Sequence, residues 1–131
     1  MTRKEIREHI FLMLFRKDFH DKEDLLNQIN IYLSQLQESK TDETLYLSNR
    51  FMAVLEKLDI IDDMLSTAAS GWILSRMGKV ELTILRLAVY EMRFDDDIPI
   101  KVAINEAVEL AKLFGGDDTP GFVNGVLAKL T

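Results

Sequence analysis

The chain has 131 residues, contains no cysteine and carries a formal net charge of −6. This length predicts one domain with a proper core, and the absence of cysteine excludes disulfides, thiolate catalysis and cysteine-ligated metal centres. No apolar run is long enough to cross a membrane, and the charged start, MTRKEIREH, is unlike a signal peptide. We therefore expect a cytoplasmic protein with no membrane partner. Taken alone, the acidic balance argues against nucleic-acid binding.

The charge is unevenly distributed along the chain. Residues 1–17 carry a net charge of +3, so the remainder carries −9. The charged groups of this first segment are Arg3, Lys4, Arg7, Arg16 and Lys17, with Glu5 and Glu8. Such asymmetry is typical of a nucleic-acid or membrane contact in one part of the chain, but the charge count alone favours the simpler explanation of a basic helix start.

Apolar residues at helical spacing predict a helix over residues 3–17 and a second over residues 21–37. The apolar stripe of the first is formed by Ile6, Ile10, Met13 and Leu14. Arg3 and Arg7 lie four residues apart on another face, and Phe11 and Phe15 continue that line. Cations and aromatic rings could therefore share a face, although Phe11 also fits the core.

A third helix is expected over residues 43–65, with Thr41 or Asp42 as its N-cap. Its expected buried side consists of Tyr46, Phe51, Val54, Leu55, Leu58, Ile61 and Leu65. A short helix is expected to carry Trp72, Ile73 and Leu74. The helix expected over residues 79–94 is apolar over a wide arc, which indicates a central, buried element.

The last two helices are expected over residues 99–114 and 122–130. Pro99 suits a first helical turn, and Thr119-Pro120 repeats a cap-plus-proline start. Gly115-Gly116 is expected to stop the earlier helix in the left-handed conformation. No strand alternation is present, so the sequence predicts an all-α fold of about seven helices.

Catalytic and metal-binding constellations are absent from the sequence. His9 and His20 lack the spacing of zinc or di-iron sites, no phosphate-binding glycine loop occurs, and Asp95-Asp96-Asp97 lacks the EF-hand pattern. We expect no enzyme activity, no metal and no cofactor. The polar groups on the apolar helices are Glu81, Glu91, Asn105, Glu106 and Glu109, with Arg76 and Arg86 as candidate ion-pair partners. Structural salt bridges explain them as well as an active site does.

Four glycines lie within residues 115–125, and two of them, Gly121 and Gly125, fall inside the expected last helix. Each costs about 1 kcal/mol relative to alanine in a helix interior. Close helix packing and close approach of a ligand explain this composition equally well. Phe122 would present its ring beside the N–H donors of the helix start, which attract phosphate.

Residues 98–115 and 122–127 carry a specific pattern. They read I-P-x-x-V-A-I-N-E-A-V-E-L-A-K-x-F-G and F-V-N-G-V-L, and the chain resembles the NusB family of bacterial transcription antitermination factors. Residues 81–91 (ELTILRLAVYE), residues 72–76 (WILSR) and the N-terminal Arg7-Glu8 with Leu14-Phe15 are also similar to that family's motifs. The resemblance covers essentially residues 1–131 as one NusB-like domain, and implies two packed helical subdomains.

The resemblance also implies a function. NusB-family members bind the boxA element of nascent RNA, most strongly with a small-subunit ribosomal protein called NusE. The complex joins other Nus factors and RNA polymerase and supports transcription of ribosomal RNA operons. Some members form homodimers.

The family's functional residues carry over onto matching positions of this chain. The implied RNA-binding residues are Arg3, Lys4, Arg7, Phe15, Asp118, Gly121, Phe122 and Asn124. Glu81 falls where the family meets its ribosomal-protein partner. The basic segment is thin, with three cations and two interspersed glutamates, so we expect weak RNA binding by the chain alone and strong reliance on the partner.

Two alternatives to an antitermination factor follow from the same pattern. A NusB-like domain also recruits substrate in ribosomal RNA cytosine methyltransferases, but no methyltransferase domain is present in these 131 residues. The other alternative is a helical recruitment or oligomerisation module without RNA specificity of its own.

Overall fold

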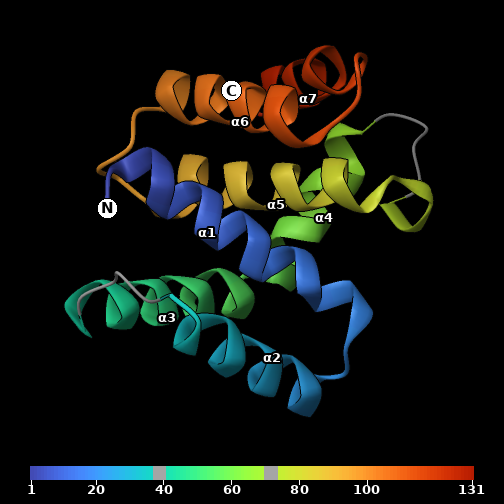
Figure 1. Ribbon diagram of the computed structural model, residues 1–131. Coiled ribbons are helices and arrows are strands. Elements are labelled where there is room, and N and C mark those ends of the chain that lie inside the picture. The colour runs from blue at the N-terminus through green and yellow to red at the C-terminus, as the bar shows by residue number, and fades with distance from the viewer. Residues whose placement is uncertain (37–40, 70–73) are drawn as a thin grey trace. The chain divides into compact units, whose positions relative to one another are not determined.

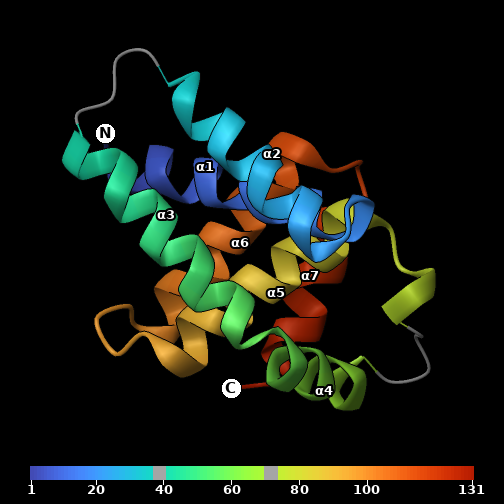
Figure 2. The ribbon, with the colours of Figure 1, turned by 90° about the horizontal axis from the view of Figure 1, so that it is seen from below.

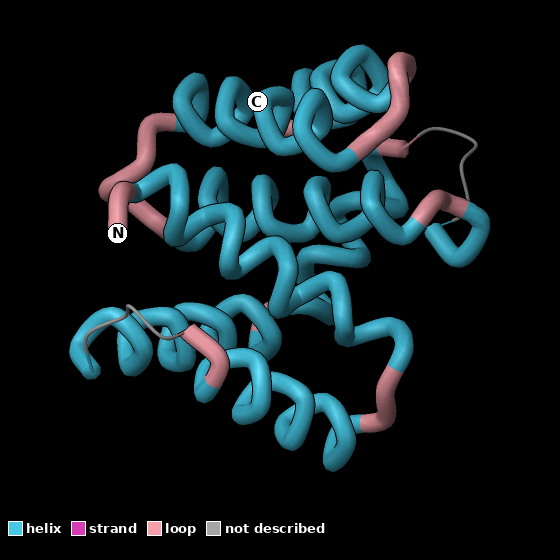
Figure 3. Tube along the Cα trace, viewed as in Figure 1, coloured by secondary structure: helices cyan, strands magenta, loops and turns pink. Residues whose placement is uncertain are grey.

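The computed structural model describes residues 1–36, 41–69 and 74–131 (Figure 1). Within these ranges the secondary structure consists of seven α-helices and two short 3-10 helices, with no strand (Figure 3). The predicted all-α fold is therefore confirmed. The chain divides into two compact helical units, Met1–Glu56 and Lys57–Thr131.

The first unit contains α1 (Arg3–Phe15), a 3-10 turn (Arg16–Phe19), α2 (Lys22–Ser34) and α3 (Thr41–Glu56). Helix α3 lies against both α1 and α2 (Figure 2). Asp21 caps α2, because its carboxylate accepts the Asp24 N–H at 2.9 Å. The buried apolar side chains of the unit are Ile10, Phe11, Met13, Leu14, Leu25, Ile29, Leu47, Phe51 and Val54.

Four details of the first unit differ from expectation. Helix α1 ends at Phe15 and continues as a 3-10 turn, and α2 ends at Ser34. Neither Thr41 nor Asp42 is an N-cap, because α3 begins at Thr41 and both residues lie in its first turn. Tyr46 is exposed, and the neighbouring Leu47 takes the buried position.

The helix expected over residues 43–65 is two helices, α3 and α4 (Leu58–Ala68). The break falls at Lys57, whose backbone has φ −96° and ψ 1°. Val54, Leu58 and Ile61 are all buried, so the apolar period passes through the break without interruption. No glycine or proline marks it, and periodicity alone therefore joins the two helices.

The second unit contains α4, a 3-10 turn (Leu74–Arg76), α5 (Lys79–Phe94), α6 (Ile100–Phe114) and α7 (Thr119–Ala128). Helix α5 contacts α4, α6 and α7, and every residue from Leu82 to Met92 is buried. The prediction of a central helix over residues 79–94 is thus confirmed. Trp72 and Ile73, expected in a short helix, lie outside the described residues.

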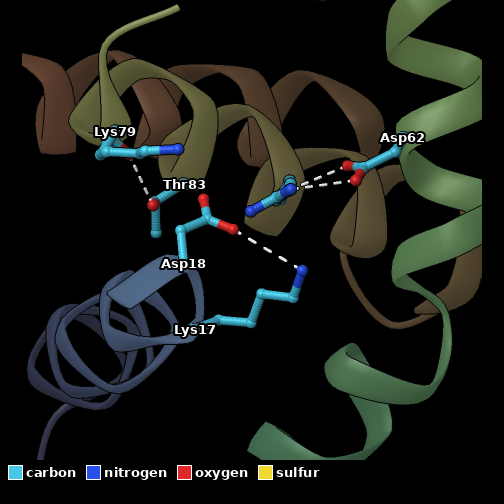
Figure 4. A network of polar contacts seen from close by, with 6 residues as sticks. Lys17, Asp18, Asp62, Lys79 and Thr83 are labelled. Atoms are coloured by element: carbon cyan, nitrogen blue, oxygen red, sulfur yellow. Dashed lines mark hydrogen bonds and ion pairs between the residues drawn. The ribbon is translucent and has the colours of Figure 1, made fainter. Parts of the chain in front are cut away.

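Polar contacts of α5 lie within the helix and between α5 and α4 (Figure 4). The Nε and Nη2 atoms of Arg86 each donate a hydrogen bond of 2.9 Å to the carboxylate of Asp62 on α4. The Thr83 hydroxyl donates to the Lys79 carbonyl one turn earlier in α5. Asp62 was not among the partners expected for Arg86. Of the polar residues noted on the apolar helices, Asn105 and Glu109 are exposed, whereas Glu91 is buried.

The connection between α6 and α7 is tighter than the sequence indicates. Gly115 has φ −101° and ψ −177°, so the expected left-handed stop is wrong. A Cβ on Gly115 would lie 2.6 Å from the side chain of Thr119, and this close approach is what requires glycine here. Helix α7 begins at Thr119, with Asp118 in the N-cap position and Pro120 in the first turn. Two expectations for these helix starts are therefore wrong: Thr119 is the first residue of α7 and not its cap, and Pro99 is the N-cap of α6 and not part of its first turn.

Candidate functional site

The start of α1 is organised by a capping box. The Thr2 hydroxyl accepts the Glu5 N–H at 3.1 Å, and the Glu5 carboxylate accepts the Thr2 N–H at 3.0 Å. The hydrogen bond from the Thr2 backbone holds the pKa of Glu5 below its usual value. Glu5 is therefore engaged at the helix end, although it stands between the cations in sequence.

The three candidate RNA-binding cations lie in the first two turns of α1. Arg3 and Lys4 are exposed, and Arg7 is half-buried. Because α1 is helical from Arg3 onward, Arg3 and Arg7 share a face, as the spacing predicted. The N-terminal ammonium forms an ion pair with Glu43 of α3, which fixes the chain just before these cations.

A row of aromatic rings follows the cations. Phe11 is 2% exposed and belongs to the core, so the row does not lie wholly on an exposed face. The rings of Phe11 and Phe15 are 6.1 Å apart, and those of Phe15 and Phe19 are 5.2 Å apart. Phe15 is half-buried, whereas Phe19 is 55% exposed. The exposed end of the row is thus Phe19, which the regular spacing of four residues could have revealed.

Polar and aromatic contacts hold α1 to α2. His9 Nδ1 lies 2.6 Å from the Tyr32 hydroxyl, and the Arg16 guanidinium lies 4.8 Å from the centre of the Tyr32 ring. Burial raises the pKa of Tyr32, so the phenol stays protonated at neutral pH. These contacts fix the position of the helix that carries the cations.

The second unit contains a pocket of about 290 Å³ between the start of α5 and the start of α7. Its walls are formed by Arg76, Met77, Gly78, Glu81, Asp118, Thr119 and Phe122. The pocket therefore brings together Glu81, the candidate partner-binding residue, with Asp118 and Phe122, two candidate RNA-binding residues. Arg76 adds a positive charge to the wall of the pocket. No sequence motif indicated a binding role for Arg76 or Thr119.

One wall of the pocket is a hydrogen-bonded chain. The Gly116 N–H donates to Thr119 Oγ1 at 3.0 Å, and the Thr119 hydroxyl donates to Glu81 Oε1 at 3.2 Å. The Glu81 carboxylate also occupies the space that a Cβ on Gly78 would need. Thr119 thus connects the wall formed by the start of α5 to the wall formed by the start of α7.

Gly121 and Asn124 lie outside the pocket, on the exposed side of α7. A Cβ on Gly121 or on Gly125 would meet no atom of the described residues within 4 Å. Close helix packing therefore does not explain these glycines within the described structure. The face they leave open suits the approach of an external backbone or base.

The candidate residues fall into two groups. The cations and Phe15 belong to the first unit, whereas Glu81 and the α7 residues belong to the second. No set of three metal-ligating side chains gathers anywhere in the described ranges. Asp95, Asp96 and Asp97 form a turn in which the Asp97 N–H donates to the Asp95 carboxylate. In the same ranges no helix has the length and apolarity required to span a bilayer.

Comparison with known proteins gives a consistent result. The family model "NusB family" matches residues 4–131. A transcription antitermination protein NusB of Lachnoclostridium phytofermentans is 55% identical over 99% of this chain and 98% of its own length. The T. maritima NusB structure superposes with a TM-score of 0.84 at 33% identity, covering 99% of this chain and 90% of that one.

A further similar structure contains ligands. It is a crystal structure of the antitermination factors NusB and NusE in complex with double-stranded RNA, and it superposes with a TM-score of 0.79 at 25% identity, covering 96% of this chain and 92% of that chain. With the match over residues 4–131 and the high identity of full-length relatives, the chain belongs to the NusB family.

Proposed function

We propose that this chain is a transcription antitermination factor that binds boxA-type single-stranded RNA together with the ribosomal protein NusE. The observation that carries the proposal is the family membership over residues 4–131, combined with the NusB–NusE–RNA complex formed by a structural neighbour. In this role the protein binds ligands and catalyses no reaction. It acts in the cytoplasm, where it supports transcription of ribosomal RNA operons.

The exposed cations of α1 support RNA binding. Phosphates are bound chiefly by arginine and lysine, and Arg3 and Lys4 are exposed at the helix start. Phe122 supports recognition of bases, because single-stranded RNA is read by stacking of unpaired bases on aromatic rings, and its ring lines the pocket beside Asp118. Phe15, Gly121 and Asn124 complete the proposed RNA-binding set.

Glu81 supports binding of the protein partner. Its carboxylate lines an open pocket on a body that carries a net charge of −9 outside the first 17 residues. An acidic surface favours association with a basic protein, and we expect NusE to be basic. Other Nus factors, RNA polymerase and a second copy of the chain are further proposed partners.

The experiment that tests this function replaces Arg3, Lys4 and Arg7 by alanine. The matched control replaces Lys22, Lys101 and Lys112, three exposed lysines, and so removes the same charge elsewhere. We expect the first variant to bind every RNA more weakly and to lose about two units of salt slope, at roughly 0.7 per phosphate contact on a single strand. Equal RNA affinity of the two variants, measured with NusE present, would contradict the assignment.

A further inference from the structure

Thr119 stands between two sites of different proposed function. The residue is 4% exposed, and its hydroxyl joins Gly116 at the α6–α7 turn to Glu81 on α5. Its neighbours in the pocket wall are Glu81, proposed to meet NusE, and Asp118 and Phe122, proposed to meet RNA. None of the family's implied RNA or protein contacts includes Thr119 itself.

The surrounding backbone is shaped to keep this threonine in place. A Cβ on Gly115 would lie 2.6 Å from Cβ, Cγ2 and Oγ1 of Thr119, so only glycine allows the turn to approach so closely. At the start of α5, a Cβ on Gly78 would meet the carboxylate end of the Glu81 side chain, which is flexible enough to move aside. Gly115 therefore permits the close approach of the turn to Thr119, from which the hydrogen-bonded connection continues to Glu81.

We propose that Thr119 is a positioning residue that couples the binding of NusE at Glu81 to the binding of RNA at the start of α7. This inference rests on the proposed function and adds to it the route by which the two ligands influence each other.

The physical basis is the ordering of shared side chains. A partner that holds the Glu81 carboxylate also holds the acceptor of the Thr119 hydroxyl, and through Thr119 it holds the Gly116 N–H and the first turn of α7. RNA that binds Asp118 and Phe122 then loses less conformational entropy on binding, because the first turn of α7 is already ordered. By linkage, RNA must strengthen the binding of NusE by the same factor.

The test measures a coupling factor, defined as the Kd for a boxA-type RNA without NusE divided by the Kd with saturating NusE. Thr119→Val keeps the shape of the side chain and removes the hydroxyl, whereas Thr119→Ser keeps the hydroxyl. We expect Thr119→Val to lower the coupling factor about two- to tenfold, as a single hydrogen bond allows, and Thr119→Ser to retain it. A purely structural role would change stability and leave the coupling factor of the folded protein unchanged.

A second pair of variants tests the same connection without altering Thr119. Gly115→Ala forces a Cβ against the threonine, whereas Gly116→Ala adds one where nothing lies within 4 Å in the described structure. We expect only Gly115→Ala to lower the coupling factor, with circular dichroism used to confirm folding of each variant.

The outcomes separate the two levels of the account. An unchanged coupling factor in both Thr119→Val and Gly115→Ala, with tight RNA binding by the parent chain and NusE, would overturn the inference and leave the proposed function standing. Absence of RNA binding by the parent chain with NusE would overturn both.

Discussion

Arg86 carries its charge into the interior of the second unit. Its side chain is 6% exposed and is held by two hydrogen bonds to Asp62, whose side chain is 29% exposed. Charged hydrogen bonds of this forked geometry are strong, and loss of one partner leaves the other charge poorly solvated. The ion pair therefore ties α4 to the central helix.

Replacing Asp62 by alanine tests this contact. We expect the free energy of unfolding to fall by about 2 kcal/mol, below the value for a fully buried pair because Asp62 is partly exposed. Urea unfolding followed by circular dichroism measures the change. Asp63→Ala removes a neighbouring exposed carboxylate and serves as the control. Equal stability of the two variants would contradict a structural role for the ion pair.

The capping box of Glu5 makes the stability of the fold depend on pH. Because the hydrogen bond from the Thr2 backbone lowers the pKa of Glu5 in the folded chain, the capping interaction contributes stability above the pKa of an unfolded glutamate and loses it as the pH falls through the folded-state pKa. We expect NMR titration to find the Glu5 pKa lower in the folded chain than in the unfolded chain. Glu5→Gln should reduce the loss of stability on acidification, with Glu56→Gln as the control for removal of one exposed carboxylate. A Glu5 pKa that is equal or higher in the folded chain would contradict the capping box.

At the scale of elements, α7 combines a buried and an open side. Val123, Val126 and Leu127 are buried, whereas Gly121, Asn124 and Gly125 are exposed. Glycine at exposed helical positions weakens the helix, so these glycines lower stability, and no packing among the described residues explains them. The proposed reason is access for RNA.

Gly121→Ala and Gly125→Ala separate stability from binding. Since a Cβ at either position meets nothing within 4 Å in the described structure, we expect each variant to gain about 0.5–1 kcal/mol in the free energy of unfolding. If α7 faces RNA, Gly121→Ala should also weaken the RNA complex formed with NusE. Chemical denaturation and RNA titration measure the two effects. A variant that is more stable and binds RNA unchanged would remove Gly121 from the binding face.

The helices could be predicted from the sequence to different degrees. Helix α5 was predicted with its exact bounds, because its apolar arc is wide and Gly78 and Asp95 flank it. The division between α3 and α4 was missed, because the apolar period continues through Lys57. The left-handed conformation predicted for Gly115 was wrong. A glycine after a helix can serve either a left-handed turn or a close approach of the backbone to a side chain, and only the tertiary contact with Thr119 decides between them.

The candidate site could be predicted only where a local motif carries it. Asp118 and Phe122 followed from the resemblance of a continuous segment, and the structure places both in one pocket with Glu81. Thr119 was expected merely to cap a helix, since its bond to Glu81 joins residues 38 positions apart. Such a contact leaves no periodic signal in the sequence.

For the whole molecule, the net charge of −6 is the sum of a basic segment, residues 1–17 at +3, and an acidic remainder at −9. A short basic segment at the start of α1 is proposed to bind phosphates, and the remaining chain, at −9, is suited to a basic protein partner. With only three candidate phosphate-binding cations, the chain alone has a small electrostatic contribution to RNA affinity. The two ligands are therefore expected to bind best together.

The most direct test of this account is titration of a boxA-type RNA with the protein, with and without NusE, at two salt concentrations. We expect weak, strongly salt-dependent binding by the chain alone and much tighter binding when NusE is present. Tight binding by the chain alone at physiological salt would contradict its reliance on the partner. Absence of RNA binding both with and without NusE would contradict the antitermination function itself.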